Sequence, residues 1–319
     1  MSNPLPRATV LMRSKNSDWV IAQALAALFA QEYTNFELFV VDSGSTDSTL
    51  EIVGQYPCRL KQIPPSAYYP GAVMNDAIAE ITTELIVFVN SDCVMLSPHS
   101  LTHLVKAFSD PHTVAAFGRQ LPRPEADPWV RRDYAIAFPE TGAAPDWMTL
   151  SLPIAAIRRS VWEKHPFYTA AWGSEDTEWG LWAREHSGGN VVYVPEAVAM
   201  HSHNYTFRQL YGRRFIEGEA DAFIYRRQET VQNLVQRTLL SGVRDAVWHL
   251  RHRDGLSATM SALPRRAVYH WAYWRGHRHG ERRIATHDTD TSIGQKVVLS
   301  RHESRRDFSS DSQNTGRVA

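Results

Sequence analysis

Cysteine is scarce in this chain, and only Cys58 and Cys93 occur among its 319 residues. Two cysteines provide neither a disulfide framework nor the paired spacing of a zinc site, which fits a reducing compartment. No window reaches about 18 uninterrupted apolar residues, so no membrane-spanning helix is expected. An apolar signal-peptide core is also missing, because residues 1–7 contain two prolines. We therefore expect a cytoplasmic protein.

The chain also lacks an excess of charge of one sign. Its formal net charge is +0, so nothing draws it as a whole to nucleic acid, and no nucleic-acid partner is expected. Between residues 208 and 283, however, arginines outnumber acidic residues about two to one. This local basic bias fits contact with phosphates or an anionic membrane surface, and a solvated helical surface explains it at least as well.

Several motifs of nucleotide binding and catalysis are missing. The chain contains neither GxxxxGK[ST] nor a GxGxxG after its first predicted strand, so P-loop and dinucleotide-binding folds lack their signature. No GxSxG is present, which weakens the case for a serine hydrolase. The chemistry must therefore come from other polar residues.

The strongest pattern that is present is the apolar run LIVFV at 85–89, which Asn90, Ser91 and Asp92 follow directly. A continuous apolar run indicates a strand that is covered on both faces in a mostly parallel sheet. Ligands of open α/β sheets bind outside the carboxyl ends of the strands, so Asp92 is well placed to meet a ligand or metal ion. A cap of the turn before Pro98 explains Asp92 equally well.

Strand and helix patterns alternate over the first two thirds of the chain. Such βα units predict a mostly parallel, doubly wound sheet with right-handed crossovers. Asp18 is expected to open the first helix, Thr46 or Asp47 the second, and Ser174 the helix at 175–186. The predicted strands cover 8–12, 36–41, 59–63, 85–89, 113–117, 151–157 and 191–194, with a further short apolar run at 197–200. The predicted helices cover 19–29, 48–56, 72–81, 99–108, 129–137, 160–164 and 175–186.

The composition divides the chain into three parts. We expect an α/β domain over 1–205, a helical extension over 206–283 and a polar, mostly disordered tail over 284–319. The aromatic and arginine residues at 269–275 resemble an interfacial helix, although a helix packed on the main domain explains them as well.

Seven polar residues fall at predicted strand ends or helix starts, where a doubly wound sheet can gather them at one edge. A hard cation such as Mg²⁺ or Mn²⁺ takes carboxylate oxygen and occasionally imidazole, so Asp92 with His201 fits a metal shell. A second carboxylate could act as general base, although the helix dipole alone also explains Glu175 and Asp176. Taken alone, His203 is expected to be a structural histidine. The seven residues are Arg13, Asp42, Asn75, Asp92, Glu175, Asp176 and His201.

Six segments of the chain form one ordered set: TVLMRSKN, FELFVVDSGSTDST, PGAVMNDAI, VFVNSDCV, WGSEDTEWGLWAR and VPEAVAMHSHNY. In this order and spacing they resemble the inverting family 2 glycosyltransferases of the GT-A fold. The later segment IRRSVWEKHPF and the arginine-rich helices are similar to bacterial rhamnosyltransferase-like members. The resemblance covers residues 8–211 strongly and the helices to 283 loosely.

This resemblance implies a role for each matching residue. Asp176 would be the general base, and Glu175 would contact the acceptor or the donor sugar. Asp92 matches the last acid of the D-x-D motif and would bind Mg²⁺ or Mn²⁺ together with His201. The first acid of that motif is replaced by Asn90, so fewer protein ligands would hold the metal. The nucleotide-sugar would be bound by Arg13, Ser14, Lys15, Asp42, Asn75, Ser91 and Asp92.

The implied reaction moves a sugar, with inversion, from a nucleotide diphosphate donor to a saccharide or lipid-linked saccharide acceptor. dTDP-rhamnose or a UDP-sugar is the favoured donor, and cell-surface polysaccharide or glycan synthesis is the expected context. A lipid-linked acceptor would make peripheral contact with the inner face of the membrane sensible. Two alternatives stay open: an enzyme with another donor sugar, such as glucose or mannose, and a non-catalytic nucleotide-sugar-binding or scaffold protein of this fold.

Overall fold

The computed structural model describes residues 5–294 and 296 of the chain. The chain divides into two compact units. Unit 1 comprises Met1–Ala126, Asp133–Tyr168 and Glu175–His203, and unit 2 comprises Asp127–Arg132, Thr169–Ser174 and Asn204–Ala319. Of the tail predicted for 284–319, residues 284–286 are helical, and everything from 297 onward lies outside the described residues.

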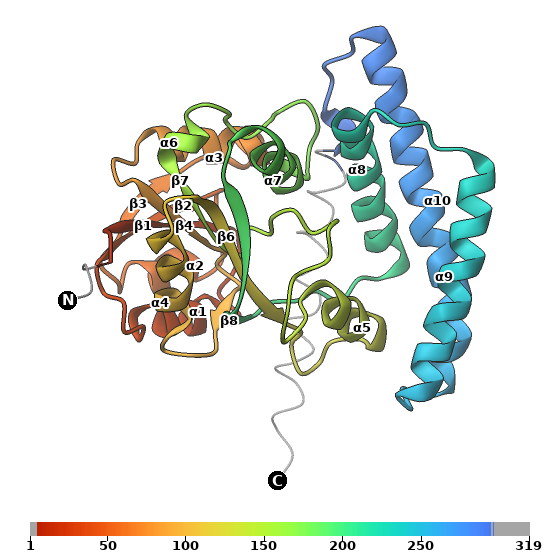
Figure 1. Cartoon of the computed structure of the whole chain (residues 1–319), viewed down its shortest axis with the longest axis horizontal. Helices are drawn as coiled ribbons and strands as arrows, with labels where there is room; N and C mark the ends of the chain where they lie inside the picture. The colour runs from red at the N-terminus through yellow and green to blue at the C-terminus, as the bar shows by residue number, and fades with distance from the viewer. Residues whose placement is uncertain (1–4, 295, 297–319) are drawn as a thin grey trace. The chain divides into compact units, whose positions relative to one another are not determined.

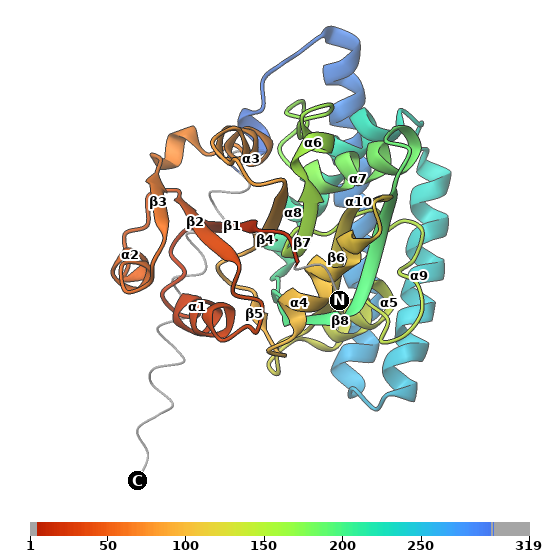
Figure 2. The same cartoon turned by 60° about the vertical axis from the view of Figure 1, so that its left-hand side comes forward.

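Unit 1 is built on an eight-stranded sheet (Figure 1). The strands are β1 (Ala8–Ser14), β2 (Phe36–Asp42), β3 (Arg59–Gln62), β4 (Leu85–Val89), β5 (Val94–Met95), β6 (Thr113–Leu121), β7 (Ile154–Arg158) and β8 (Asn190–Met200). Their order in the sheet is β3-β2-β1-β4-β7-β6-β8-β5, and Figure 2 shows its first four members in sequence. Within the described residues, four of the seven strand pairings are parallel.

Helices cover both faces of this sheet. They are α1 (Ile21–Phe29), α2 (Thr49–Val53), α3 (Pro70–Ala79), α4 (Ser100–Lys106), α6 (Arg159–Trp162) and α7 (Glu175–His186), with α5 (Pro128–Ala137) shared between the two units. Along β1, Val10 contributes to a core with residues of α1 and α4, whereas Leu11 contributes to a core with residues of α3 and α7. This alternation arises because successive side chains of a strand point to opposite faces of the sheet. All five residues of β4 are buried, as its continuous apolar run predicts.

The predicted α/β fold, a mostly parallel sheet flanked by helices, is confirmed, with one refinement of its topology. Strand β7 runs antiparallel to both β4 and β6. Its direction is reversed because the segment 122–153 returns the chain to the sheet at the edge where β6 ended. In addition, β7 begins at Ile154, three residues after the start of the predicted strand.

The strand predicted at 191–194 is longer than expected, since β8 is continuous from Asn190 to Met200 and includes the apolar run at 197–200. The pairing register with β6 shifts between Gly118 and Arg119. Pro195 lies opposite this shift and has no N–H to donate to a ladder. The shift therefore lets one strand continue past a residue that cannot be paired.

The predicted helix starts also differ from the structure. Val20 precedes α1 as N-cap in place of Asp18, and Ser48 precedes α2, although Asp47 still accepts a hydrogen bond from the Thr49 N–H at 3.1 Å. Ser174 has a φ of 61°, in the left-handed region. An N-cap residue normally has extended dihedral angles, so Ser174 enters α7 differently from the prediction. This strained residue lies directly before Glu175.

Unit 2 consists mainly of the long helices α8 (Phe207–Tyr225), α9 (Val231–Arg251) and α10 (Leu256–Thr286). A capping box of Thr206 and Gln209 begins α8. Gly276 lets α8 and α10 approach closely, because a Cβ at this position would overlap the Phe215 carbonyl oxygen. Within the described part of the chain, no helix combines the length and the apolar character needed to cross a membrane.

Candidate active site

The carboxyl ends of β1 and β4 meet at one edge of the sheet. The Ser91 N–H, just after β4, donates to the Arg13 carbonyl oxygen at 3.3 Å. The Ser91 hydroxyl also lies 2.8 Å from that of Ser17. These contacts fix the start of the Ser91-Asp92 turn against the end of β1, as parallel neighbouring strands require.

Asp92 lies in a compact cluster with two histidines that follow β8. Its Oδ1 is 3.7 Å from Nε2 of His201, and its Oδ2 is 3.3 Å from Nε2 of His203. One ligand atom from each of the three residues lies within 4.8 Å of the others. Adjacent ligands of a six-coordinate Mn²⁺ or Mg²⁺ stand about 3 Å apart, so the cluster has the dimensions and the donor types of such a site.

Gln120 sets the orientation of the His201 ring. Its Nε2 donates to the Ser151 hydroxyl at 2.8 Å, which leaves its Oε1 facing Nδ1 of His201 at 2.9 Å. Nδ1 of His201 is thus held by Gln120, and Nε2 faces Asp92. A metal-ligating histidine usually has its other ring nitrogen held by a hydrogen bond in this way, so the arrangement fits a metal ligand.

The carboxylate pair at the start of α7 forms the second part of the site. Glu175 accepts a hydrogen bond from Nη1 of Arg13 at 3.2 Å. Asp176 accepts from the N–H of Thr177 at 2.8 Å and lies 3.5 Å from that of Leu152. Burial, with a smaller contribution from the Glu175 charge, raises the pKa of Asp176 to about 6. Such a carboxylate is ionised at neutral pH and still accepts a proton readily.

Two chains of contacts join the carboxylate pair to the cluster of Asp92, His201 and His203. Arg13 contacts Ser91 through its carbonyl group and Glu175 through its side chain. On the other side, the Asn90 N–H donates to the Pro153 carbonyl oxygen at 3.2 Å, next to the Leu152 N–H that faces Asp176. The structure therefore brings Arg13, Asp92, Glu175, Asp176 and His201 to one edge of unit 1.

Asp42 has a different environment from that predicted for a ligand-binding acid. Its carboxylate is fully buried and accepts hydrogen bonds from the Ser14 hydroxyl at 2.8 Å, from the N–H groups of Gly44 and Ser45, and from the Ser45 hydroxyl. Lys15 donates to the Ser43 carbonyl oxygen at 2.8 Å. In the structure these residues shape the turn after β2, and their contact with a nucleotide stays a prediction.

Asn75 likewise makes hydrogen bonds within the protein. Its Nδ2 donates to the Phe167 carbonyl oxygen at 2.7 Å, and its Oδ1 accepts from the Phe167 N–H and the Trp162 indole. These three bonds tie α3 to the end of α6 and to the segment that follows it. A direct role of Asn75 in donor binding also stays a prediction.

Three residues of the site lie outside the sequence prediction. The sequence predicts a structural role for His203, whereas the structure places it beside Asp92; the His201-x-His203 spacing is the signal in the sequence that points to this position. Gln120 and Arg123 gave no signal, because both act through contacts distant in sequence. Arg123 donates to the Asp92 carbonyl oxygen at 2.6 Å, and its guanidinium lies 4.7 Å from the centre of the Trp19 ring.

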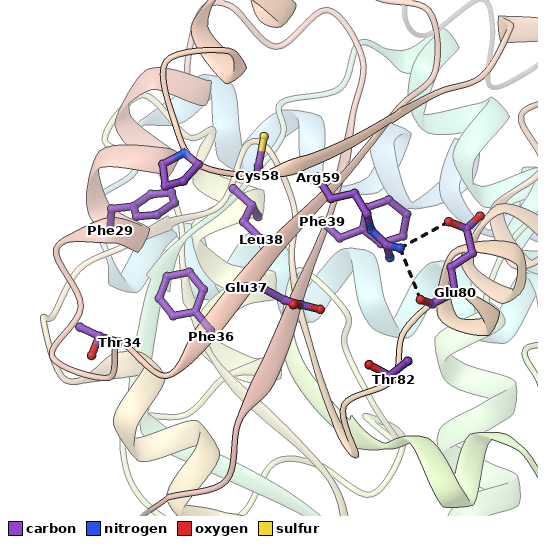
Figure 3. Close-up of a pocket in the computed structure, with 11 residues that line it drawn as sticks. Phe29, Thr34, Phe36, Glu37, Leu38, Phe39, Cys58, Arg59, Glu80 and Thr82 are labelled. Carbon is purple, nitrogen blue, oxygen red and sulfur yellow. Dashed lines mark hydrogen bonds and ion pairs between the residues drawn. The ribbon is translucent and has the colours of Figure 1, made fainter.

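A hollow of about 620 Å³ lies elsewhere on unit 1, among the first residues of β2 and β3 (Figure 3). This is the end of β2 opposite to Asp42. The Arg59 guanidinium stacks 3.6 Å above the Phe39 ring and pairs with Glu80, and Glu37 pairs with Arg7. The charged side chains that line the hollow are thus engaged in ion pairs, and none of them belongs to the site described above.

The mostly parallel sheet and the helices on its two faces form the GT-A fold of glycosyltransferases. The chain belongs to glycosyl transferase family 2, whose sequence profile matches residues 9–168. The family predicted from the six sequence segments is thereby confirmed.

Two curated relatives and one solved structure are similar to this chain. The O-antigen chain rhamnosyltransferase WbaN of Salmonella anatum is 31% identical over 207 residues, which cover 59% of this chain and 64% of WbaN, slightly less than two thirds. RfbN of Salmonella typhimurium, of the same description, is 29% identical over 66% of this chain and 71% of its own length. The mannosyltransferase PcManGT from Pyrobaculum calidifontis, solved with GDP-Man and Mn²⁺, has the same fold, with a TM-score of 0.56. It is 18% identical, and the match covers 93% of this chain and 86% of PcManGT.

Proposed function

We propose that this glycosyltransferase moves a sugar from a nucleoside diphosphate donor to an acceptor hydroxyl by one displacement with inversion. The observation that carries the proposal is Asp176, a partly buried carboxylate with a pKa of about 6 at the edge that also holds Asp92. The catalytic domain would span 1–205, with 206–283 as a helical extension. No enzyme nucleophile is required for such a displacement.

Asp176 would act as the general base. It would take the proton of the acceptor hydroxyl while that oxygen forms its bond to the anomeric carbon. The bond from the anomeric carbon to the phosphate oxygen breaks, and its electron pair leaves with the nucleoside diphosphate. Glu175, held by Arg13, would orient the acceptor or donor sugar beside this base.

Asp92, His201 and His203 would hold a divalent cation, Mg²⁺ or Mn²⁺. When bound, the cation supplies positive charge that stabilises the departing diphosphate. His203 compensates for Asn90, the residue that replaces the first acid of the D-x-D motif. Gln120 keeps Nε2 of His201 directed at this site. The presence of Mn²⁺ in the PcManGT structure supports this assignment.

The relatives point to the substrates. Both Salmonella proteins are described as rhamnosyltransferases of an O-antigen chain, which favours dTDP-rhamnose over a UDP-sugar as the donor here. The acceptor would be a saccharide, free or lipid-linked, in the synthesis of a cell-surface polysaccharide. The GDP-mannose of PcManGT keeps a mannosyl donor as the second candidate.

The test combines binding and turnover. UDP, dTDP, GDP and CMP are each tested with and without Mn²⁺ for a rise in melting temperature, because a ligand of the folded state stabilises it by mass action. The Asp176→Asn variant should lose transfer by about 10²-fold or more and keep its response to the nucleotide. Glu185→Gln, an exposed carboxylate of the same helix, is the matched control.

Two results would count against the proposal. Loss of nucleotide binding in Asp176→Asn, with the chemical step intact, would exclude the general-base role. No response to any nucleotide and no turnover of any donor would instead favour the non-catalytic scaffold.

A further inference from the structure

Helix α9 presents a row of large apolar side chains to solvent. Between 39% and 64% of the surface of each is exposed, although such residues are usually buried. They are Val235, Leu239, Leu240, Val243, Val247 and Leu250. At about 100° per residue they occupy a continuous arc of roughly 140° around the helix axis. The buried residues of α9, such as Gly242 and Asp245, lie outside this arc.

The beginning of α10 extends the same surface. Leu256, Met260 and Leu263 are 71%, 70% and 45% exposed and recur at helical spacing. Helices α9 and α10 lie side by side (Figure 1), and a Cβ at Gly242 would lie 2.7 Å from Cδ1 of Leu263. The two rows are therefore neighbours. We call these nine residues the α9–α10 apolar surface.

Arginines border this surface on one side. Arg244 and Arg251 are seven positions apart, so they form a stripe along α9 next to Val247 and Leu240. Arg253 follows in the turn after α9, and all three arginines are exposed. Among the residues that the structure describes, no carboxylate lies within salt-bridge distance of these three guanidinium groups.

The acidic residues between 231 and 263 do not offset this charge. Only Asp245 and Asp254 occur there. Asp245 is buried between Arg132 and Arg266, and Asp254 pairs with His249 and Arg131. The solvent-facing side of the stretch thus carries apolar and basic side chains together with the uncharged Gln232 and Gln236, and its two carboxylates pair with other cations.

We propose that the α9–α10 apolar surface docks onto an anionic lipid bilayer. Apolar side chains enter the boundary between headgroups and acyl chains, and Arg244, Arg251 and Arg253 meet lipid phosphates at headgroup level. A second copy of this chain suits the surface less well. The second copy would present the same arginines and no exposed carboxylate from residues 231–263. Its surface would therefore repel the arginines of the first copy.

The proposed surface lies outside the segment for which the sequence leaves both an interfacial helix and a packed helix open. That segment is 269–275, where Trp271 is 45% exposed but Tyr273 is buried and donates to Asp221. The structure points to α9 and the start of α10, while Trp271 lies further along the exposed side of α10. The inference uses no property of Asp92 or Asp176, so it is independent of the proposed reaction.

The test is co-sedimentation of the full chain with vesicles of phosphatidylcholine alone or mixed with phosphatidylglycerol. The unmodified protein should bind the mixed vesicles, and added salt should weaken binding because it screens the arginines. The double variant L239Q/V243Q should bind about tenfold more weakly or worse, and R244Q/R251Q should lose its preference for anionic lipid. The matched control is L60Q/L96Q, which removes two exposed leucines of unit 1 that are 41% and 49% exposed.

Folding is checked independently by the melting temperature of each variant. Absence of binding to the mixed vesicles at low salt would overturn the proposal. A concentration-dependent dimer that L239Q/V243Q abolishes, without vesicle binding, would assign the surface to a second copy of the chain. Equal loss of binding in the L60Q/L96Q control would show that the α9–α10 apolar surface is not the docking site.

Discussion

Nη1 of Arg13 lies 3.2 Å from Oε1 of Glu175, across 162 positions of sequence. The side chains are 18% and 11% exposed, so the pair is shielded from solvent more than a surface ion pair is. The pair joins the end of β1 to the first turn of α7. It also keeps a positive charge close to Asp176, which lowers the pKa that burial raises.

The acid side of the pH–rate profile should report Asp176. In the proposed reaction the ionised form of Asp176 is the base, so kcat/KM should fall as the pH drops through about 6. Arg13→Met removes a charge that favours the ionised form and should move this decline to higher pH. Arg7→Met is the control, because Arg7 pairs with Glu37 at an exposed position. An acid limb that is the same in Arg13→Met and the unmodified enzyme would contradict the assignment.

Asp176→Asn should stabilise the protein at neutral pH while it removes activity. The folded-state pKa of Asp176 is raised from 3.8 to about 6, so the folded protein binds this proton more tightly than the unfolded chain does. Ionisation therefore costs stability as the pH rises from about 4 to 6, by roughly 3 kcal/mol at most. The variant should gain about 1–3 kcal/mol in urea unfolding at about pH 8, and the gain should shrink near pH 4. A variant less stable at pH 8 would show that the charge is well compensated.

Gln120→Leu should weaken Mn²⁺ binding by about 10- to 100-fold, because His201 loses the group that holds its Nδ1. Free Mn²⁺ measured by electron paramagnetic resonance gives the affinity without any need for turnover. Gln120→Glu keeps an acceptor at this position and should bind the ion more tightly than Gln120→Leu. Unchanged affinity in Gln120→Leu, with an unchanged melting temperature, would exclude a positioning role for Gln120.

Gly276→Ala should destabilise the helical unit by about 1–3 kcal/mol. The added methyl group would overlap the backbone oxygen of Phe215, so α8 and α10 would have to move apart. Gly54→Ala is the control, since a Cβ there lies 3.4 Å from the nearest atom, the Leu50 carbonyl oxygen. Urea unfolding followed by circular dichroism measures both variants. Equal stability of the two would mean that the helices adjust without cost.

Much of the fold could be predicted from local patterns. The continuous apolar run of β4 and the helical spacing in α1 are properties of neighbouring residues, and they identify the elements correctly. Antiparallel β7 could not be predicted in this way, since its direction depends on the edge at which the segment 122–153 re-enters the sheet. The family resemblance named Asp92, Glu175, Asp176 and His201, which the structure brings to one edge.

The order of apolar and polar residues thus decided the class of fold and the approximate position of each element, because secondary structure follows from spacing along the chain. Tertiary structure alone decided the environment of each functional group. The Gln120 carbonyl reaches His201 across 81 positions, and the burial of Asp176 depends on elements far from it in sequence. Hydrogen-bond partners and desolvation are properties of the folded protein, so no local pattern contains them.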